Sequence, residues 1–345
     1  MRPTMSDVAH AAGVSTMTVS NVLTGRRRVS TQTRTRVERA AADLGYELNL
    51  TARHLRAGRT DTVALAVPFF DHPYFGELAA RLARLLAPEG RHLVVEQTGP
   101  SREAELAAVT RARWQLYDGV LLSVVGMTAA DLDDLRTSVP LVLLGEQQMP
   151  ARYDHVRMDN VGGARLATAH LLATGARRIA VVGGAEPSAD AGMMPARTLG
   201  WALAHEDAGA AAEPGLVVRA PADLASGREA VRRIVRDGIA FDAVLAVTDT
   251  LAAGVLAGLA EAGLRVPDDV QVVGFDNLAS SELTVPALST VDPGHEHLAT
   301  EALRLLDVAV ARGPGRGADG AADAPRHVTA PAELVLRATT RERRG

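Results

Sequence analysis

Short apolar runs alternate with helix-length amphipathic segments along most of this chain, and this alternation restricts the class of fold that it can adopt. From Thr62 onward the apolar runs are TVALAVPFF, HLVVEQ, DGVLLSVV and PLVLLGE, and the segment 102–114 between two of them has the spacing of a helix. After Asp159 the alternation starts again with RRIAVVGG, LVVRA, AVLAVTD and VQVVGFD. Strands that alternate with helices form parallel sheets with helices on both faces. The sequence therefore predicts an α/β body of two doubly wound parallel-sheet lobes.

The first sixty residues differ from the rest of the chain in charge. They carry ten Arg and four acidic residues, a formal charge of +6, so the remaining residues account for −10 of the total of −4 (−4 minus +6). A basic head that precedes an acidic body is typical of proteins that bind nucleic acids through one end.

Composition excludes several other classes of protein. Apolar residues make up 47% and charged residues 23% of the chain, which are proportions of a globular protein and not of a disordered chain or a fibre. The absence of Cys excludes disulfides, thiol catalysis and zinc sites built on Cys. The start of the chain lacks the apolar core of a signal peptide, and no later stretch reaches about 18 apolar residues. We therefore expect a cytoplasmic protein.

Three short helices are predicted in the basic head. Thr4 and Asp7 form a capping pattern for the first helix, which ends at Gly13, and Ser15 can cap a second helix from Thr16 to about Leu23. Two short helices joined by a turn that contains Gly are the helix-turn-helix arrangement, in which the second helix enters the major groove of DNA. Ser30 can cap a third helix that closes at Gly45. The expected buried positions are Val8, Ala9, Ala12, Val19, Val22, Leu23, Val37, Ala40, Ala41 and Leu44.

The string AGVSTMTVSNVLTGRRRVSTQTRTRVERAAADLGY, continued by ELNLTARHLRAGRT, resembles the head of LacI/GalR-family transcription regulators almost residue for residue. The resemblance covers nearly the whole chain. It implies a helix-turn-helix DNA-binding domain at 1–46, a hinge at 47–60 and a domain for effector binding and dimerisation at 61–345. In that third part the resemblance implies that the chain returns through both lobes, which share a periplasmic-binding-protein-like fold. Lobe 1 is expected at about 61–158 plus 291–320, and lobe 2 at about 159–290 plus 321–341.

The resemblance also implies which side chains of the second helix contact DNA. Thr16, Met17 and Asn21 face the bases, and Thr18 and Ser20 lie nearer the phosphates. Many family members have Arg, which reads guanine, where this chain has Asn21, and an Asn amide matches adenine. Met17 has no hydrogen-bond donor, and its apolar side chain suits a thymine methyl group.

Two further groups of residues are expected at the DNA. Arg26, Arg27 and Arg28 form a turn that either is a solvated charge run or contacts phosphates. In the hinge, the Leu that corresponds to Leu55 enters the minor groove in the family and kinks the duplex, and a small residue at Ala52 permits close approach. Leu48 replaces the Pro that usually precedes this hinge, which makes its entry less rigid.

Polar and aromatic residues at predicted strand ends point to a ligand site between the lobes. Carboxylates and an Arg can hold the hydroxyls of a sugar, and aromatic faces can cover its apolar side. In the resemblance, PARTLGW carries the Arg that clamps the effector, TDTLAAG carries one Asp and VVGFDN another, whereas Thr248 replaces an Asn common in sugar-responsive members. The expected effector-binding residues are Asp71, Tyr74, Phe75, Asp159, Arg197, Trp201, Asp249 and Asp276.

For several of these residues the sequence leaves a structural interpretation open. Tyr74 and Phe75 could be core aromatics, Arg197 and Asp276 could form a structural ion pair, and Asp159 could be a helix cap.

Other functions receive less support from the sequence. No GxGxxG, GxxxxGK[ST], HExxH or GxSxG string is present, so an enzyme lacks its sequence motif and no cofactor is expected. His295 and His297 lie on one predicted helix but do not face one way, so no metal site is expected. The main alternative is a solute-binding protein of the transport type, which has the same two-lobed body. The preferred prediction is a repressor that binds pseudo-palindromic operator DNA as a homodimer under the control of a small molecule, either a sugar or a sugar derivative.

Overall fold

The computed structural model describes residues 3–24, 29–46, 59–110, 112–135, 137, 139–145, 152–189, 192–312 and 324–342. The chain divides into two compact units, Met1–Thr60 and Asp61–Gly345. Among the helices in those described ranges, none combines the length and the apolar character that a membrane span requires.

The first unit is built from the helices α1 (Met5–Ala12), α2 (Thr16–Thr24) and α3 (Thr31–Asp43). The capping box predicted at the start of α1 is present: the Thr4 backbone N–H donates to Asp7 at 2.8 Å, and Gly13 ends the helix with φ of 60°. Ser15 and Ser30 cap the next two helices, because their hydroxyls accept from the backbone N–H groups of Thr18 and Thr33.

The core of the head contains nearly every position that the pattern predicts. Its buried members are Val8, Ala9, Ala12, Val19, Val22, Val37, Ala40 and Ala41. Leu23 is partly buried against them, but the prediction for Leu44 is wrong, because that side chain is 39% exposed. Leu44 forms the C-cap of α3, and Tyr46 packs against the core in its place.

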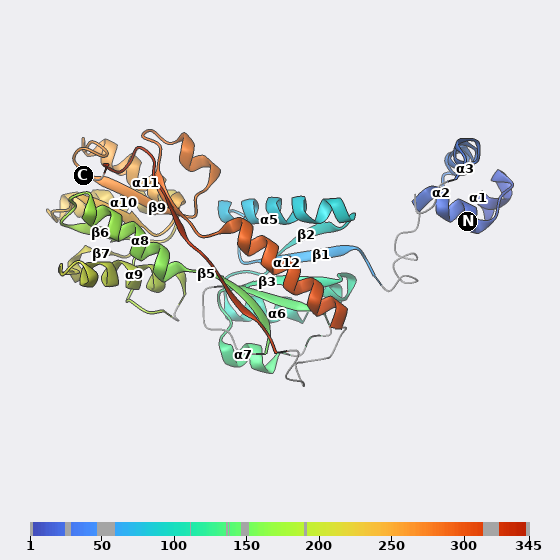
Figure 1. Cartoon of the computed structure of the whole chain (residues 1–345), viewed down its shortest axis with the longest axis horizontal. Helices are drawn as coiled ribbons and strands as arrows, with labels where there is room; N and C mark the ends of the chain where they lie inside the picture. Colours follow the sequence, from blue (N-terminus) through green and yellow to red (C-terminus); the bar gives the residue numbers. More distant parts are fainter. Residues whose placement is uncertain are drawn as a thin grey trace. The chain divides into compact units, whose positions relative to one another are not determined.

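The second unit contains two six-stranded sheets, one in each lobe (Figure 1). The first sheet has the order β11-β5-β4-β3-β1-β2, and all its strands are parallel. Its strands are β1 (Thr62–Val67), β2 (His92–Gln97), β3 (Gly119–Val124), β4 (Leu141–Gly145), β5 (Asp154–Met158) and β11 (His327–Ala330). Its helices are α5 (Pro73–Leu86), α6 (Arg102–Val109), α7 (Ala129–Asp134) and α12 (His295–Arg312), with short 3₁₀ turns at Ala87–Glu89 and Ala112–Leu116.

Alternation along β1 shows why both faces of this sheet are covered. Val63, Leu65 and Val67 belong to the cluster that α5 and α12 complete, whereas Ala64 and Ala66 belong to the cluster that α6 and α7 complete. Successive side chains of a strand point to opposite faces, so a strand apolar throughout requires helices on both sides.

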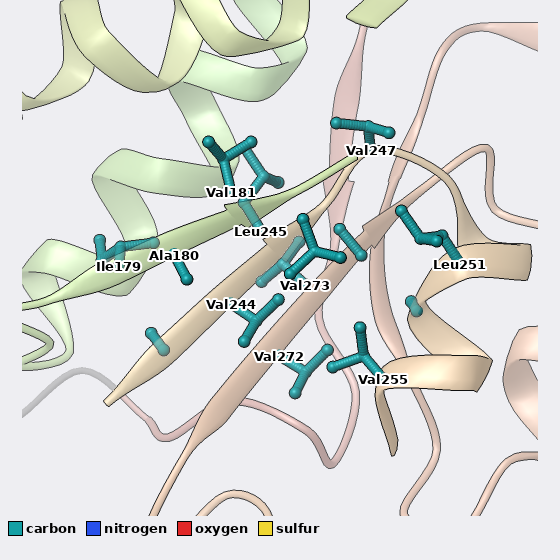
Figure 2. Close-up of a cluster of buried hydrophobic side chains, with 14 of the residues drawn as sticks. Ile179, Ala180, Val181, Val244, Leu245, Val247, Leu251, Val255, Val272 and Val273 are labelled. Atoms are coloured by element: carbon teal, nitrogen blue, oxygen red, sulfur yellow. The ribbon is translucent and has the colours of Figure 1, made fainter. Parts of the chain in front are cut away.

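The second sheet has the equivalent order β12-β10-β9-β8-β6-β7, but only five of its strands are parallel, because the edge strand β12 pairs with β10 in the antiparallel direction. Its strands are β6 (Ile179–Val182), β7 (Val217–Val218), β8 (Ala243–Ala246), β9 (Gln271–Phe275), β10 (Ser289–Asp292) and β12 (Glu333–Val335). Its helices are α8 (Asn160–Ala173), α9 (Met193–Asp207), α10 (Leu224–Arg236) and α11 (Asp249–Glu261), with 3₁₀ turns η3 (Pro214–Leu216) and η4 (Ala279–Leu283). Figure 2 shows how Val and Leu side chains of β6, β8 and β9 pack against α11.

Small residues let the helices α10 and α11 approach closely. A Cβ at Gly254 would lie 2.1 Å from the Leu224 carbonyl oxygen, and one at Gly227 would lie 2.2 Å from the Leu251 carbonyl oxygen. Only Gly fits where two helix backbones come this near each other.

The return of the chain through both lobes differs from the prediction in one boundary. The segment 321–341 was assigned to lobe 2, but β11 pairs with β5 of the first sheet, and only β12 pairs with β10 of the second. The passage into lobe 2 therefore lies after Ala330. The strand β5 itself was absent from the predicted apolar runs, since DHVRM contains a buried Asp154 and a buried His155.

Candidate functional site

A cavity of about 720 Å³ lies between the two lobes of the second unit. Residues that follow the carboxyl ends of the parallel strands of both sheets line it, which is the usual position of a ligand site in such sheets. The first lobe contributes Pro68, Phe69, Asp71, His72, Pro73, Tyr74, Phe75, Leu78, Ser123, Val124, Val125, Leu144, Gly145, Val156, Arg157, Met158 and Leu298. The second lobe contributes Gly192, Met193, Met194, Pro195, Arg197, Pro221, Ala222, Asp223, Thr248, Thr250 and Asp276.

The wall from lobe 1 is aromatic because α5 begins directly behind the end of β1. Pro73 occupies the first turn of α5, where its missing N–H costs nothing, and His72, Tyr74 and Phe75 gather around it. The Tyr74 and Phe75 ring centroids are 5.0 Å apart, and those of His72 and Phe75 are 5.8 Å apart. Tyr74 and Phe75 also pack against the core of lobe 1. The interpretation of both residues as core aromatics is therefore confirmed, and because each also lines the cavity, contact with an effector stays a prediction.

Arg197 dominates the wall from lobe 2. Its Nε donates to Asn160 at 2.7 Å, Nη1 donates to the Val247 carbonyl oxygen and to Asp276, and Nη2 donates to Asp276 and to the Met158 sulfur. The guanidinium lies 3.5 Å from the centroid of the Phe275 ring. All five N–H groups of this buried side chain thus have an acceptor within the protein, and the ion pair with Asp276 is part of the fold as well as of the cavity wall.

Asp276 has an unusual backbone. Its φ is 114°, a value that non-Gly residues rarely adopt, and the structure holds it there by three contacts. Its N–H donates to the Val291 carbonyl at 2.9 Å, its own carbonyl accepts from His295 Nε2, and its carboxylate pairs with Arg197. Strained residues of this kind cluster at ligand and switch sites.

Three of the predicted effector-binding residues do not line the cavity. Asp159 caps α8, because its side chain accepts from Gly162 N–H at 2.8 Å. Trp201 is 2% exposed and donates its indole N–H to the Ile179 carbonyl oxygen at 3.0 Å within the core of lobe 2. Asp249 accepts from Leu278 N–H and from two hydroxyls. These three predicted residues therefore lie outside the lining of the cavity.

The contacts of Asp249 show what its carboxylate does. It accepts from Leu278 N–H at 2.9 Å, Ser281 Oγ at 2.6 Å and Thr290 Oγ1 at 2.5 Å. Burial raises the pKa of Asp249 to about 6, although these three donors oppose the shift. The residue joins α11, η4 and β10 behind the cavity wall.

The cavity also contains polar residues that the sequence did not reveal. His72, Ser123, Arg157, Asp223 and Thr250 line it. Burial, and secondly the charge of Arg197, lowers the pKa of His72, so its ring is neutral at physiological pH. Two of these residues directly follow predicted residues at a strand end: His72 follows Asp71, and Thr250 follows Asp249. Their position next to a predicted residue is the signal by which the sequence could have identified them.

In the first unit, α2 presents the predicted DNA-contacting residues. Met17 is 70% exposed although it is a large apolar residue, Thr16 is also exposed, and Ser20 and Asn21 are partly exposed. The Thr18 hydroxyl shares a hydrogen bond of 2.9 Å with Ser15 at the start of the helix. Five predicted positions lie outside the described residues: Arg26, Arg27, Arg28, Ala52 and Leu55.

Comparison with known proteins covers both units. Residues 4–49 match the family "Bacterial regulatory proteins, lacI family", and residues 168–340 match a "Periplasmic binding protein-like domain". The transcriptional regulator CelR of Thermobifida fusca is 35% identical over 321 residues, which cover 88% of this chain and 91% of that protein.

Several solved structures resemble nearly the whole chain, and two of them are described here. A CelR–cellobiose complex has a TM-score of 0.69 at 31% identity and covers 98% of this chain and 100% of its own. The lac repressor dimer bound to operator and the anti-inducer ONPF has a TM-score of 0.79 at 26% identity and covers 99% of both chains. The match to regulators includes the helical head, which excludes the alternative of a transport-type binding protein without a DNA-binding role. On its sequence, its two units and these matches, the chain belongs to the lacI family of bacterial regulatory proteins.

Proposed function

We propose that this protein is a cytoplasmic repressor that binds operator DNA as a homodimer and changes its affinity for that DNA when a small molecule occupies the cavity. One observation carries the proposal: a lacI-family head at 4–49 and an interlobe cavity of about 720 Å³ belong to the same chain. By linkage, operator DNA changes the affinity for the small molecule by the same factor. The cavity binds its ligand without transforming it.

In this proposal the second helix of the head reads the operator. Met17 contacts a thymine methyl group, and Asn21 pairs with adenine, while Thr16 adds a third base contact. Thr18 and Ser20 contact phosphates and set the register of the helix. The exposure of Met17 is compatible with this arrangement, because a side chain that is 70% exposed on the second helix can reach a base edge.

The remaining DNA contacts come from the other predicted positions. Arg26, Arg27 and Arg28 bind phosphates, and Leu55 enters the minor groove beside the small Ala52. A homodimer presents two heads to two half-sites of a palindrome, and the relative of known structure is a dimer on its operator.

The small molecule is a sugar or sugar derivative that contacts Asp71, Tyr74, Phe75, Arg197 and Asp276. All five residues line the cavity, and they combine carboxylates, one guanidinium and aromatic rings, which is the set that binds sugars. The related regulator of known structure was solved with cellobiose.

The test retrieves genomic DNA fragments with the purified full-length protein and sequences them. We expect one palindromic motif, which Leu55→Ala weakens and which the exposed control Ala42→Ser leaves unchanged. Asn21→Arg should replace an adenine of each half-site by guanine. Recovery of no motif overturns the repressor proposal, whereas equal binding of operators with G and A by the unaltered protein overturns only the role of Asn21.

A further inference from the structure

Met17 differs from the other methionines of the chain in its access to solvent. The chain has eight Met, and Met1 and Met149 lie outside the described residues. Among the described Met residues, only Met17 is exposed, at 70%. Met5 is partly buried against the core of the head, and the others are buried or partly buried in the lobes: Met127, Met158, Met193 and Met194. An oxidant in solution therefore reaches the sulfur of Met17 more easily than the sulfur of any other described Met.

The helix α2 holds this side chain on a surface that the head presents to solvent. Met17, Ser20 and Asn21 share one face of the helix, because they are three and four residues apart. Val19 and Val22 on the opposite face are buried in the core. In the proposed function the outward face lies against the bases, and Met17 contacts a thymine methyl group. The most accessible of the described thioethers is therefore also a proposed base contact.

The thioether of Met17 needs no activation by a neighbouring residue to be oxidised. Hydrogen peroxide transfers one oxygen atom to the sulfur: the O–O bond of the peroxide breaks, an S–O bond forms, and water is released. The product, methionine sulfoxide, is polar where the thioether is apolar. Because the chain contains no Cys, no thiol of the protein competes for the peroxide.

A sulfoxide at this position weakens the contact with DNA. Its oxygen binds water that must be removed when the helix enters the major groove, and a thymine methyl group offers no donor to replace that water. The fold of the head does not depend on the Met17 side chain, which is not part of the buried cluster of the three helices. Oxidation therefore lowers the affinity for DNA while the head stays folded.

We propose that Met17 is an oxidation site through which hydrogen peroxide releases this regulator from its operator. The peroxide converts Met17 to the sulfoxide in the free protein, and each head of a dimer then loses one base contact. The two types of methionine sulfoxide reductase, one for each epimer, reverse the reaction and restore binding. This inference rests on the proposed function, because it requires that α2 faces the bases.

The experiment uses the full-length protein and a DNA fragment that carries the motif it retrieves. The protein is treated briefly with hydrogen peroxide, peptide mass spectrometry locates the added oxygen, and fluorescence anisotropy measures the dissociation constant for the fragment. We expect the peptide that contains Met17 to be oxidised before any other Met peptide. The dissociation constant should then rise at least about tenfold, since a lost base contact in each half-site has an effect of this size. Circular dichroism should show unchanged helix content.

Two variants assign the effect to one side chain. Met17→Leu has an apolar side chain of similar volume that peroxide does not oxidise, so its dissociation constant should change less than about twofold on treatment. Met5→Leu is the matched control in the same head, and it should lose affinity on treatment as the unaltered protein does. Both reductases with dithiothreitol should restore the affinity of the oxidised unaltered protein, which has no disulfide for the reagent to break.

The possible outcomes separate this inference from the proposed function. Equal affinity before and after oxidation of Met17, an equal loss of affinity in Met17→Leu, or earlier oxidation of another Met would overturn the inference and leave the repressor intact. A loss of affinity that the reductases do not reverse would overturn it as well. Failure of the untreated protein to retrieve any motif counts against the proposed function, and the inference fails with it.

Discussion

The two lobes share one strand order but present different chemistry to the cavity between them. The aromatic rings that line the cavity all come from lobe 1, whereas the buried ion pair of Arg197 and Asp276 comes from lobe 2. Topology thus places the strand ends at the cavity, and the loop residues that follow them decide what can bind there. The two lobes share one further feature. Behind the cavity wall of each lobe, a buried carboxylate accepts hydrogen bonds that hold a loop in place. In lobe 1 Glu105 accepts from three backbone N–H groups, and in lobe 2 Asp249 accepts from one N–H and two hydroxyls.

The largest expected effect distinguishes the two arginines of the cavity. Arg197→Met leaves Asp276 buried without its cation and should destabilise the body by about 4 kcal/mol. Arg157→Met removes a partly buried side chain whose Nε bonds to Thr329, and should cost about 1 kcal/mol or less. Thermal unfolding of both variants measures the difference. Similar losses of unfolding free energy in the two variants would contradict this difference between the two arginines.

A second prediction concerns pH. The pKa of Asp249 is raised from 3.8 to about 6, so protonation favours the folded state, and the resulting stability is complete below about pH 4 and lost as pH rises to 6. Relative to Asp249→Asn, the unaltered protein should lose about 3 kcal/mol across that interval and little above pH 7. The measurement is the difference in unfolding free energy between the two proteins at successive pH values.

In lobe 1, Asp131 should make stability depend on pH in the direction opposite to Asp249. Hydrogen bonds from Arg102 lower the pKa of Asp131, so its stabilising effect is present above the unfolded pKa and is lost as pH falls. Relative to Asp131→Asn, the unaltered protein should therefore gain stability with rising pH. The difference in unfolding free energy should thus fall with rising pH for Asp249 and rise with pH for Asp131. If both differences change in the same direction, the opposite pKa shifts assigned to these two carboxylates are incorrect.

A third prediction tests the loop behind the wall of lobe 1. Glu105→Ala removes the acceptor of the Val125, Gly126 and Met127 N–H groups and should destabilise the protein by about 2 kcal/mol, because buried donors are left without partners. Glu103→Ala on the exposed side of the same helix is the matched control and should change the unfolding free energy by less than about 0.5 kcal/mol. Urea unfolding followed by circular dichroism measures both.

The smallest effect compares helix caps in the two lobes. Asp159→Ala removes the cap of α8, and Ser101→Ala removes the cap of α6, which accepts from Ala104 N–H at 3.2 Å. Each should cost about 1 kcal/mol. Neither should alter effector affinity in calorimetry, and a loss of affinity confined to Asp159→Ala would restore that residue to the site.

Most of the fold could be predicted because apolar periodicity is a local signal. Such patterns predict both lobes, the head and the caps of its helices. The strand β5 was missed because it has too few apolar residues. The sheet that β11 joins could not be predicted, because its pairing with β5 depends on contacts between residues distant in sequence.

The rule of strand ends placed Asp71, Tyr74, Phe75, Arg197 and Asp276 at the cavity. It failed where local geometry decides the direction of a side chain: Asp159 turns back onto its own helix, and Trp201 lies one turn beyond Arg197, inside the core.

The return of α12 and β11 to the first sheet also determines when the sheet of lobe 1 can be covered during synthesis. The five parallel strands of lobe 2 have all been made once Asp292 leaves the ribosome. Lobe 1 began earlier, yet Val63, Leu65 and Val67 still lack the cover that Leu298, Ala302 and Leu306 of α12 provide. The lobe whose strands are synthesised first therefore keeps one sheet face uncovered until α12 is made, so a chain that stops before α12 has a complete head but leaves an apolar sheet face open to aggregation.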